Sequence, residues 1–355
     1  MSVRAKHSLL WSPLPFVPGL LFEALVRARN GMYDARLLPQ LRLPHPVISI
    51  GNLTVGGSGK TPLAIYVAQT VSRMGGIPVL LSRGYGTALK APVILPPGES
   101  VSFPAQVLGD EPALVRRHEA RLWLGISPDR HATGLRISRR GAPMLFILDD
   151  GFQHRRLKRD LDVLIIDRMQ PLAQNRMVPR GTLREPMAGL RRADLVVING
   201  LHEGSGCDPV EATIREIKPN IVIFHCIQQI QHLMSFAEWQ GNSSAAEPSR
   251  DTTAAFLVAA IGNPERFRRD VQALGIEIKG ARFFRDHSRL RPGDWLSCTR
   301  EARASGAGAL ITTEKDAIKL SDALDLPLLV AVQSTRLAEQ SELEQMLGTM
   351  IEGNK

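Results

Sequence analysis

The sequence predicts an α/β fold in which helices cover both faces of a mostly parallel sheet. Short apolar runs rich in β-branched residues alternate with helical stretches along most of the chain, as at 143–150, 161–167, 193–200 and 220–226. Such strands are buried on both faces when a helix forms each crossover between parallel strands. The chain has 355 residues, 44% of them hydrophobic, and this length favours two domains over one large core.

The N-terminal segment predicts a helix at a membrane surface. Residues 9–26 are largely apolar, but prolines and Glu23 interrupt them, and Arg27 and Arg29 follow. A spanning helix needs about 20 unbroken apolar residues, so no span is expected, and the lack of a small-residue cleavage site argues against a signal peptide. We expect residues 1–30 to lie in the membrane interface with the arginines toward lipid phosphates. The alternative is a helix packed on the protein's own core.

Residues 31–237 are expected to form the larger domain. A predicted strand at 45–53 is followed by a glycine-rich loop, a helix at 61–76, a strand at 77–86 and a helix at 110–123. Residues 238–253 are polar, small and rich in serine, which indicates a linker or loop. Residues 254–355 repeat the alternation of strand and helix. They predict a smaller C-terminal α/β domain, with a cleft between the two domains.

The chain is basic, with 44 Lys and Arg against 35 Asp and Glu and a formal charge of +9. A basic surface favours an anionic partner such as a nucleic acid, an acidic lipid or a phosphorylated small molecule, although a solvated basic surface is also common. Aromatic residues make up only 5% of the chain and stud no basic strand, which argues against a nucleic-acid partner. Cys207, Cys226 and Cys298 form no CxxC pair, so neither a disulfide framework nor a zinc site is expected.

The string GNLTVGGSGKTP at 51–62 predicts a phosphate-binding loop, as in P-loop NTPases. It lies between a predicted strand and helix and matches G-x-x-x-x-G-K-[ST] except at its first position. We expect nucleotide phosphates to contact Thr54, Val55, Gly56, Gly57, Ser58, Gly59, Lys60 and Thr61. Lys60 would reach the β- and γ-phosphates, and the Thr61 hydroxyl would ligate Mg²⁺. The alternative is a glycine-rich turn without a chemical role.

A second motif, MLFILDDGFQH at 144–154, predicts the acidic partner of that loop. An apolar strand that ends in Asp149 and Asp150 aims a carboxylate at a magnesium ion held by the loop threonine. Two adjacent carboxylates at a buried strand end repel each other unless a cation lies between them. The pattern does not say which aspartate binds the metal, and a plain turn is the alternative.

Together these strings resemble the tetraacyldisaccharide 4′-kinases of lipid A assembly. The likeness extends over nearly the whole chain and includes, in order, GNLTVGGSGKTP, SRGYG, GDEP, LDDGFQH, LREP, FRDH and TTEKDAIKL. A phosphate loop that begins with threonine is itself typical of that family. The sequence departs from the family at Arg180, Thr182 and Ser288, which bears on contacts to the acceptor.

The resemblance implies transfer of the ATP γ-phosphate to the 4′-hydroxyl of tetraacyldisaccharide 1-phosphate, giving lipid IVA. ATP and Mg²⁺ are the implied cofactors, and the acylated disaccharide and the membrane surface are the implied partners. No nucleic acid and no obligate protein partner are expected. The implied location is the cytoplasmic face of the bacterial inner membrane, with the protein bound peripherally.

The same resemblance implies roles for residues on the acceptor side. Asp110 in GDEP matches the family's proposed base, His287 in FRDH matches its partner, and Glu111 is expected at the metal or at a water on it. Without the resemblance, the alternative for Asp110 is a helix N-cap. His287 alone fits a surface or core histidine.

Further polar residues have more than one interpretation each. Arg184 in LREP is expected to contact a phosphate, or to pair with Glu185. His154 begins a basic run, 154–159, that fits a substrate phosphate, lipid headgroups or solvent. Nucleotide contact and interdomain pairing stay open for Lys315 and Asp316.

The competing interpretation is a P-loop GTPase or a nucleotide-dependent chaperone that acts on a protein partner. It would share Lys60, Thr61 and Asp149 with the kinase. Guanine recognition commonly uses an Asn-Lys-x-Asp string, and the sequence contains none.

Overall fold

A computed structural model describes residues 16–84, 91–99, 104–141, 143–170, 176–200, 208–241, 253–286, 288–320 and 324–353. The strands within these residues are β1 (Val47–Gly51), β2 (Ile77–Ser82), β3 (Val93–Leu95), β4 (Trp123–Ile126), β5 (Met144–Asp149), β6 (Leu161–Asp167), β7 (Leu195–Asn199), β8 (Val222–Ser235), β9 (Ala254–Ala259), β10 (Glu277–Phe283), β11 (Ala309–Thr313) and β12 (Leu328–Leu337). The helices are α1 (Phe16–Asp34), α2 (Lys60–Arg73), α3 (Pro104–Leu108), α4 (Asp110–His118), α5 (Arg130–Ser138), the 3₁₀ helix η1 (Met187–Arg192), α6 (Pro209–Ile217), α7 (Phe236–Gln240), α8 (Pro264–Gln272), α9 (Pro292–Ala304), α10 (Glu314–Ala317) and α11 (Gln340–Glu352).

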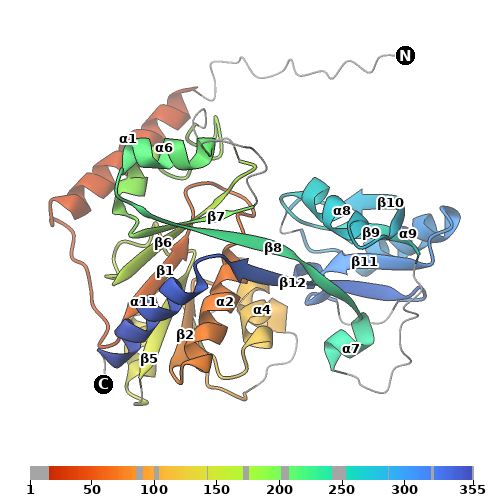
Figure 1. Cartoon of the computed structure of the whole chain (residues 1–355), viewed down its shortest axis with the longest axis horizontal. Helices are drawn as coiled ribbons and strands as arrows, with labels where there is room; N and C mark the ends of the chain where they lie inside the picture. Colours follow the sequence, from red (N-terminus) through yellow and green to blue (C-terminus); the bar gives the residue numbers. More distant parts are fainter. Residues whose placement is uncertain are drawn as a thin grey trace.

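The described strands form one sheet in the order β10-β9-β11-β12-β8-β7-β6-β1-β5-β2-β4-β3. Neighbouring strands are parallel except in the pairs β12–β8 and β3–β4. Helices lie on both faces of the sheet (Figure 1). The predicted α/β class with a mostly parallel sheet is therefore confirmed.

Two long strands join the two lobes of the molecule. We call β1–β7 with the helices on them the N-terminal lobe, and β9–β11 with α8–α10 the C-terminal lobe. β8 and β12 pair antiparallel and run from one lobe into the other (Figure 1). The sequence predicts a strand only over 220–226, whereas β8 continues to Ser235. Its second half contains the polar pairs Gln228–Gln229 and Gln231–His232, so it lacks the continuous apolar run of the other strands.

The last helix of the described chain returns to the N-terminal lobe. Leu343, Leu347 and Ile351 of α11 are buried in the same core as Leu63 and Val67 of α2. Apolar residues of α2 recur every three to four positions, so that one face of the helix packs on the sheet. The domain limits expected from the sequence, 1–30, 31–237, 238–253 and 254–355, stay a prediction.

The helix α1 lies along the outside of the N-terminal lobe (Figure 1). Leu20, Leu21 and Leu25 are 47%, 60% and 61% exposed, while Val26 packs against a buried cluster of the lobe. One face of the helix is thus held by the protein and another presents leucines to the outside. Within the part of the chain that the structure describes, none of the helices has the length and hydrophobicity of a membrane span.

Candidate active site

The loop between β1 and α2 has a backbone shaped for an anion. Gly56 and Gly59 have φ angles of 111° and 94°, which favour glycine. α2 begins at Lys60, and the N–H groups at a helix start favour negative charge. Where a glycine is usual, the buried Thr54 donates its hydroxyl to Gln170 Oε1 at 2.7 Å. The threonine therefore fixes the loop instead of lining it.

Strand-like pairing ties this loop to the segment that carries Arg184. Val55 N donates to Thr182 O at 2.7 Å, and Arg184 N donates to Leu53 O at 2.7 Å. The pairing places the Arg184 side chain beside the loop, although the two segments are far apart in the sequence.

A buried glutamine supports the loop from behind. Gln228 on β8 is 5% exposed, donates from Nε2 to Gly59 O at 2.8 Å and accepts from Asn199 Nδ2 at 3.0 Å. A Cβ atom at Gly59 would lie 2.2 Å from Gln228 Oε1, so the site has no room for one. Gln228 was not predicted, because it lies in the half of β8 that the sequence pattern does not reveal.

The two aspartates of the second motif form an acidic corner next to the loop. Asp149 ends β5 and accepts from Ser82 Oγ at 3.1 Å. Asp150 has a φ of 47°, which turns its carboxylate toward the loop. Its Oδ1 lies 3.7 Å from Lys60 Nζ, and its Oδ2 lies 2.5 Å from Arg184 NH1.

The two carboxyl groups differ in their charge state. Burial, together with the charges of Glu111 and Asp150, raises the pKa of Asp149 to about 7. Burial also acts to raise the pKa of Asp150, but Lys60 and Arg184 outweigh it and hold that pKa below its usual value. Asp150 is therefore ionised at neutral pH, whereas Asp149 holds its proton more readily.

An unpredicted arginine closes this corner. Arg130 on α5 is 5% exposed and donates from NH1 to Asp149 O at 3.0 Å. Burial lowers the pKa of Arg130 to about 10, which leaves it charged at neutral pH. No sequence pattern marks it, since it comes from a helix start outside every motif.

Asp110 begins α4 and faces the same region. Gly109, with a φ of 90°, occupies the N-cap position, so the interpretation of Asp110 as the helix cap is wrong. The Asp110 carboxylate instead pairs with Lys319 Nζ at 2.9 Å. Lys319 belongs to the C-terminal lobe and lies in the TTEKDAIKL string, but it was not singled out.

Lys315 and Asp316, the C-terminal residues with open roles, make different contacts. Lys315 Nζ lies 3.2 Å from Asp286 Oδ1. Asp316 is 1% exposed and accepts from Ala260 N and Thr313 Oγ1, each at 2.9 Å, which makes it a structural support of its own lobe. His287 lies outside the described residues.

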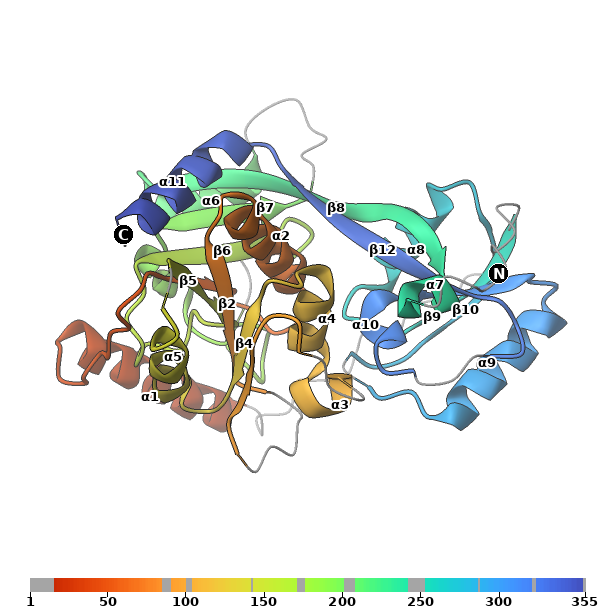
Figure 2. The same cartoon turned by 90° about the horizontal axis from the view of Figure 1, so that it is seen from below.

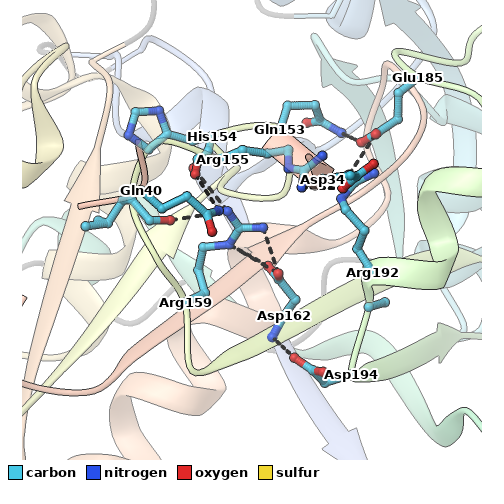
Figure 3. A network of polar contacts seen from close by, with 12 residues as sticks. Asp34, Gln40, Gln153, His154, Arg155, Arg159, Asp162, Glu185, Arg192 and Asp194 are labelled. Atoms are coloured by element: carbon cyan, nitrogen blue, oxygen red, sulfur yellow. Dashed lines mark hydrogen bonds and ion pairs between the residues drawn. The ribbon is translucent and has the colours of Figure 1, made fainter. Parts of the chain in front are cut away.

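Glu185 does not pair with Arg184 in the described part of the chain. It is 1% exposed and contacts Arg192 and Gln153 at 2.7 and 2.9 Å (Figure 3). The alternative salt bridge expected for Arg184 is therefore wrong, and the guanidinium faces Asp150.

The basic run at 154–159 is largely used inside the protein. Arg155 pairs with Asp34 and Arg159 with Asp162, each at 2.7 Å (Figure 3). Burial, with the charges of Arg130, Arg159 and Arg156, lowers the pKa of His154 to about 3. His154 is therefore neutral at physiological pH and offers a hydrogen bond rather than a charge.

The loop from Val55 to Thr61, the acidic corner, Arg130, Asp110 and Lys319 line one cavity of about 1670 Å³ that lies between the lobes and extends to α1. Its lining includes Thr61, Glu111, Arg184 and His154, and Phe22 and Val26 at the α1 end. Gly262 of the C-terminal lobe lies close to the loop, since a Cβ atom there would be 3.2 Å from Gly57 N.

Comparison with known proteins identifies this arrangement. A family model described as tetraacyldisaccharide-1-P 4′-kinase matches residues 10–352. The chain belongs to this family. It is 34% identical over 351 residues to a tetraacyldisaccharide 4′-kinase of Chlorobium limicola, covering 96% of this chain and 98% of the relative. It is 36% identical over 375 residues to one of Syntrophus aciditrophicus, covering 99% of both chains.

A solved structure shows the same fold. The crystal structure of LpxK from Aquifex aeolicus, in complex with ATP, matches with a TM-score of 0.70 and 28% identity, over 96% of this chain and 98% of that one. The resemblance drawn from the sequence is thus confirmed, and with it an ATP-dependent phosphotransferase. The GTPase or chaperone alternative is not favoured.

Proposed function

We propose that the cavity binds ATP at the β1–α2 loop and tetraacyldisaccharide 1-phosphate between that loop and α1. The γ-phosphate passes to the 4′-hydroxyl, and lipid IVA is the product. The observation that carries this proposal is the single cavity lined by the loop, the acidic corner, Asp110 and the apolar side chains of α1. The loop suits a phosphate donor, and the apolar side chains of α1 suit the acyl chains of the acceptor.

The loop and its neighbouring cations are assigned to the phosphates. Backbone N–H groups between Gly56 and Thr61 surround the nucleotide phosphates, with Lys60 at the β- and γ-phosphates, while Thr54 and Val55 hold the loop in place. Arg184 lies at Asp150 and is close enough to the loop to neutralise charge on the transferred group. Both cations have their side chains already placed by the fold.

The acidic corner fits a magnesium ion. Asp150 Oδ1 is buried and accepts no hydrogen bond from the described residues, and Asp149 shares its surroundings with Glu111 and Asp150. Hard oxygen donors of this kind suit Mg²⁺. We assign the ion to Thr61, Asp149, Asp150 and Glu111, directly or through water. When bound, Mg²⁺ neutralises charge on the phosphates.

Asp110 is assigned to the acceptor hydroxyl. A sugar hydroxyl is a poor nucleophile, and its proton has to leave as the new bond to phosphorus forms. The Asp110 carboxylate is 20% exposed to the cavity and takes that proton in this proposal. Asp286 lines the same cavity, and His287, the next residue in the sequence, is assigned to orient the carboxylate.

The helix α1 is assigned to the membrane surface. An acylated acceptor stays in the bilayer, so the enzyme works at the lipid boundary, and the exposed leucines of α1 adjoin the cavity through Phe22 and Val26. We propose peripheral binding at the cytoplasmic face of the inner membrane. Neither nucleic acid nor an obligate protein partner is part of this proposal.

Phosphate transfer tests the function directly. The purified protein, with ATP labelled on the γ-phosphate and acylated disaccharide 1-phosphate in detergent, is expected to produce labelled lipid. Lys60→Met should remove this activity, whereas Lys279→Met, at an exposed ion pair with Glu277, should not. Label that stays in ATP or appears only as free phosphate would contradict the proposal.

Membrane binding is tested separately with vesicles of anionic phospholipid. Leu21→Glu with Leu25→Glu should reduce co-flotation with the vesicles, because charged side chains resist entry into the interface. Leu274→Glu is the matched control, since Leu274 is 41% exposed on the other lobe. Equal flotation of all variants would exclude α1 as the main membrane contact.

A further inference from the structure

One short segment of the C-terminal lobe contacts both ends of α4. Lys319 Nζ lies 2.9 Å from Asp110 Oδ2 at the start of the helix, and Glu314 Oε1 lies 2.8 Å from His118 Nε2 at its end. Figure 2 shows α4 beside α10, the helix that contains Glu314. The residue assigned to the acceptor proton therefore belongs to a helix of one lobe that the other lobe holds at two points.

The Lys319 ammonium is a fixed group. Its side chain is 9% exposed, and besides Asp110 it contacts Asp316 Oδ1 and Ser288 O, each at 3.4 Å. An ammonium has three N–H donors, and three oxygens surround this one. Asp316 is itself anchored by Ala260 N and Thr313 Oγ1, so the lysine is held from the side away from the cavity.

The second contact point is equally well defined. Glu314 is 5% exposed and accepts from His118, from Trp239 Nε1 at 3.2 Å and from Gln333 N at 3.1 Å. Burial acts to raise the pKa of Glu314, but these donors outweigh it and hold the pKa below its usual value, so the carboxylate is charged. Arg117, next to His118, lies 3.8 Å from the centre of the Trp239 ring.

We propose that Lys319 is a positioning residue for phosphate transfer, acting through Asp110. The ion pair fixes Oδ2 and leaves Oδ1 to take the acceptor proton. Through Ser288 O the same ammonium also contacts the segment that follows β10. The Glu314–His118 pair prevents α4 from turning away. This inference depends on the role proposed above for Asp110.

A plain stabilising ion pair would look the same in the structure but would behave differently in a double-mutant cycle. If Lys319 acts through Asp110, its removal has no further effect once the carboxylate is gone. If it only stabilises the contact between the lobes, the two losses of activity multiply. Stability alone does not separate these cases, whereas turnover does.

The experiment compares kcat and the KM for ATP in Lys319→Met, Lys319→Arg, Asp110→Asn and the double variant Lys319→Met with Asp110→Asn. Lys319→Met should lose about 10- to 100-fold in kcat with the KM for ATP within about threefold, because a small misplacement of a reacting group has a large cost. Lys319→Arg should recover part of this loss. Lys279→Met, in the same lobe, should keep wild-type turnover, and thermal unfolding shows that each variant is folded.

The double variant decides the inference. Its residual rate, measured at high enzyme concentration, should lie within about threefold of Asp110→Asn alone. A further loss equal to that of the single Lys319→Met variant, or equal losses in the Met and Arg variants, would overturn it. Wild-type turnover in Asp110→Asn would instead refute the proposed role of Asp110, and absence of transfer by the unaltered enzyme would refute the proposed function.

Discussion

The phosphate side of the cavity and the side that holds Asp110 are assembled in different ways. On the phosphate side, the loop and the acidic corner each come from one unbroken strand-to-turn segment, and β1 and β5 are neighbours in the sheet. On the acceptor side, Asp110 in the N-terminal lobe pairs with Lys319 in the C-terminal lobe. The phosphate side is therefore built on neighbouring strands of the sheet and supported by β8, whereas the carboxylate proposed to act on the acceptor is held by a contact between the lobes.

Because the two sides are built differently, substitutions on each side should affect ATP binding and the rate of transfer differently. Changes at the loop should weaken ATP binding and transfer together, because the phosphates themselves are displaced. Changes at the contact between α4 and residues 314–319 should slow transfer and leave ATP binding nearly intact. The predictions below test this separation in order of expected size.

Apart from the loss of Lys60 or Asp110 itself, the largest effect is expected from Gly59→Ala. Alanine at a φ of 94° is strained by roughly 1–3 kcal/mol. Its Cβ atom would lie 2.2 Å from Gln228 Oε1, so the glutamine side chain would have to move. We expect ATP affinity to fall about 100-fold by titration calorimetry. Gly293→Ala is the matched control, since a Cβ atom there meets nothing within 4 Å. Wild-type affinity in Gly59→Ala would show that the loop is not held as described.

A smaller effect is expected from Glu314→Gln. The amide keeps the shape of the side chain but offers His118, Trp239 and Gln333 a weaker acceptor, and the buried donors lose part of their pairing. Transfer should slow by about 3- to 10-fold with ATP affinity unchanged, as for a small loss of orientation. Glu265→Gln, at an exposed position of α8, should have no effect. An equal loss of ATP affinity would contradict the separation of the two sides.

The smallest effect concerns the pH dependence of stability. The pKa of His154 is about 3 in the folded protein, below the 6.5 of an unperturbed histidine. The unfolded chain therefore binds more protons between these values, and this histidine lowers stability as the pH falls below about 6.5. In His154→Gln, the decrease in unfolding free energy between pH 7 and pH 5 should be smaller by roughly 1 kcal/mol, allowing for solvent screening. Urea unfolding at both pH values measures it, and an unchanged decrease would show that His154 is not held neutral in the folded protein.

The same contrast explains what the sequence reveals. The loop at 54–61 and the aspartates at 149–150 were predicted because a strand, a turn and a functional side chain follow one another in the chain. Gln228, Arg130 and Lys319 were not, because each is a single polar residue whose meaning comes from a partner far away in the sequence. The α/β class follows from periodicity alone, while the long β8 that joins the lobes does not.

The family resemblance points to Asp110, and the structure adds its ion pair with Lys319. GDEP says nothing of Lys319, since the two residues lie in different lobes. The family resemblance therefore suggests the role of Asp110, and the fold shows which residue of the other lobe contacts it.

The most direct test of the account is the rate of a single phosphate transfer in Asp110→Asn, measured with saturating ATP and acylated disaccharide 1-phosphate beside ATP affinity in the same preparation. We predict a rate about 10²- to 10⁴-fold below that of the unaltered enzyme, as expected for loss of a general base, with ATP affinity within about threefold. A rate equal to that of the unaltered enzyme would contradict the account, because the carboxylate at the junction of the lobes would then have no part in the reaction.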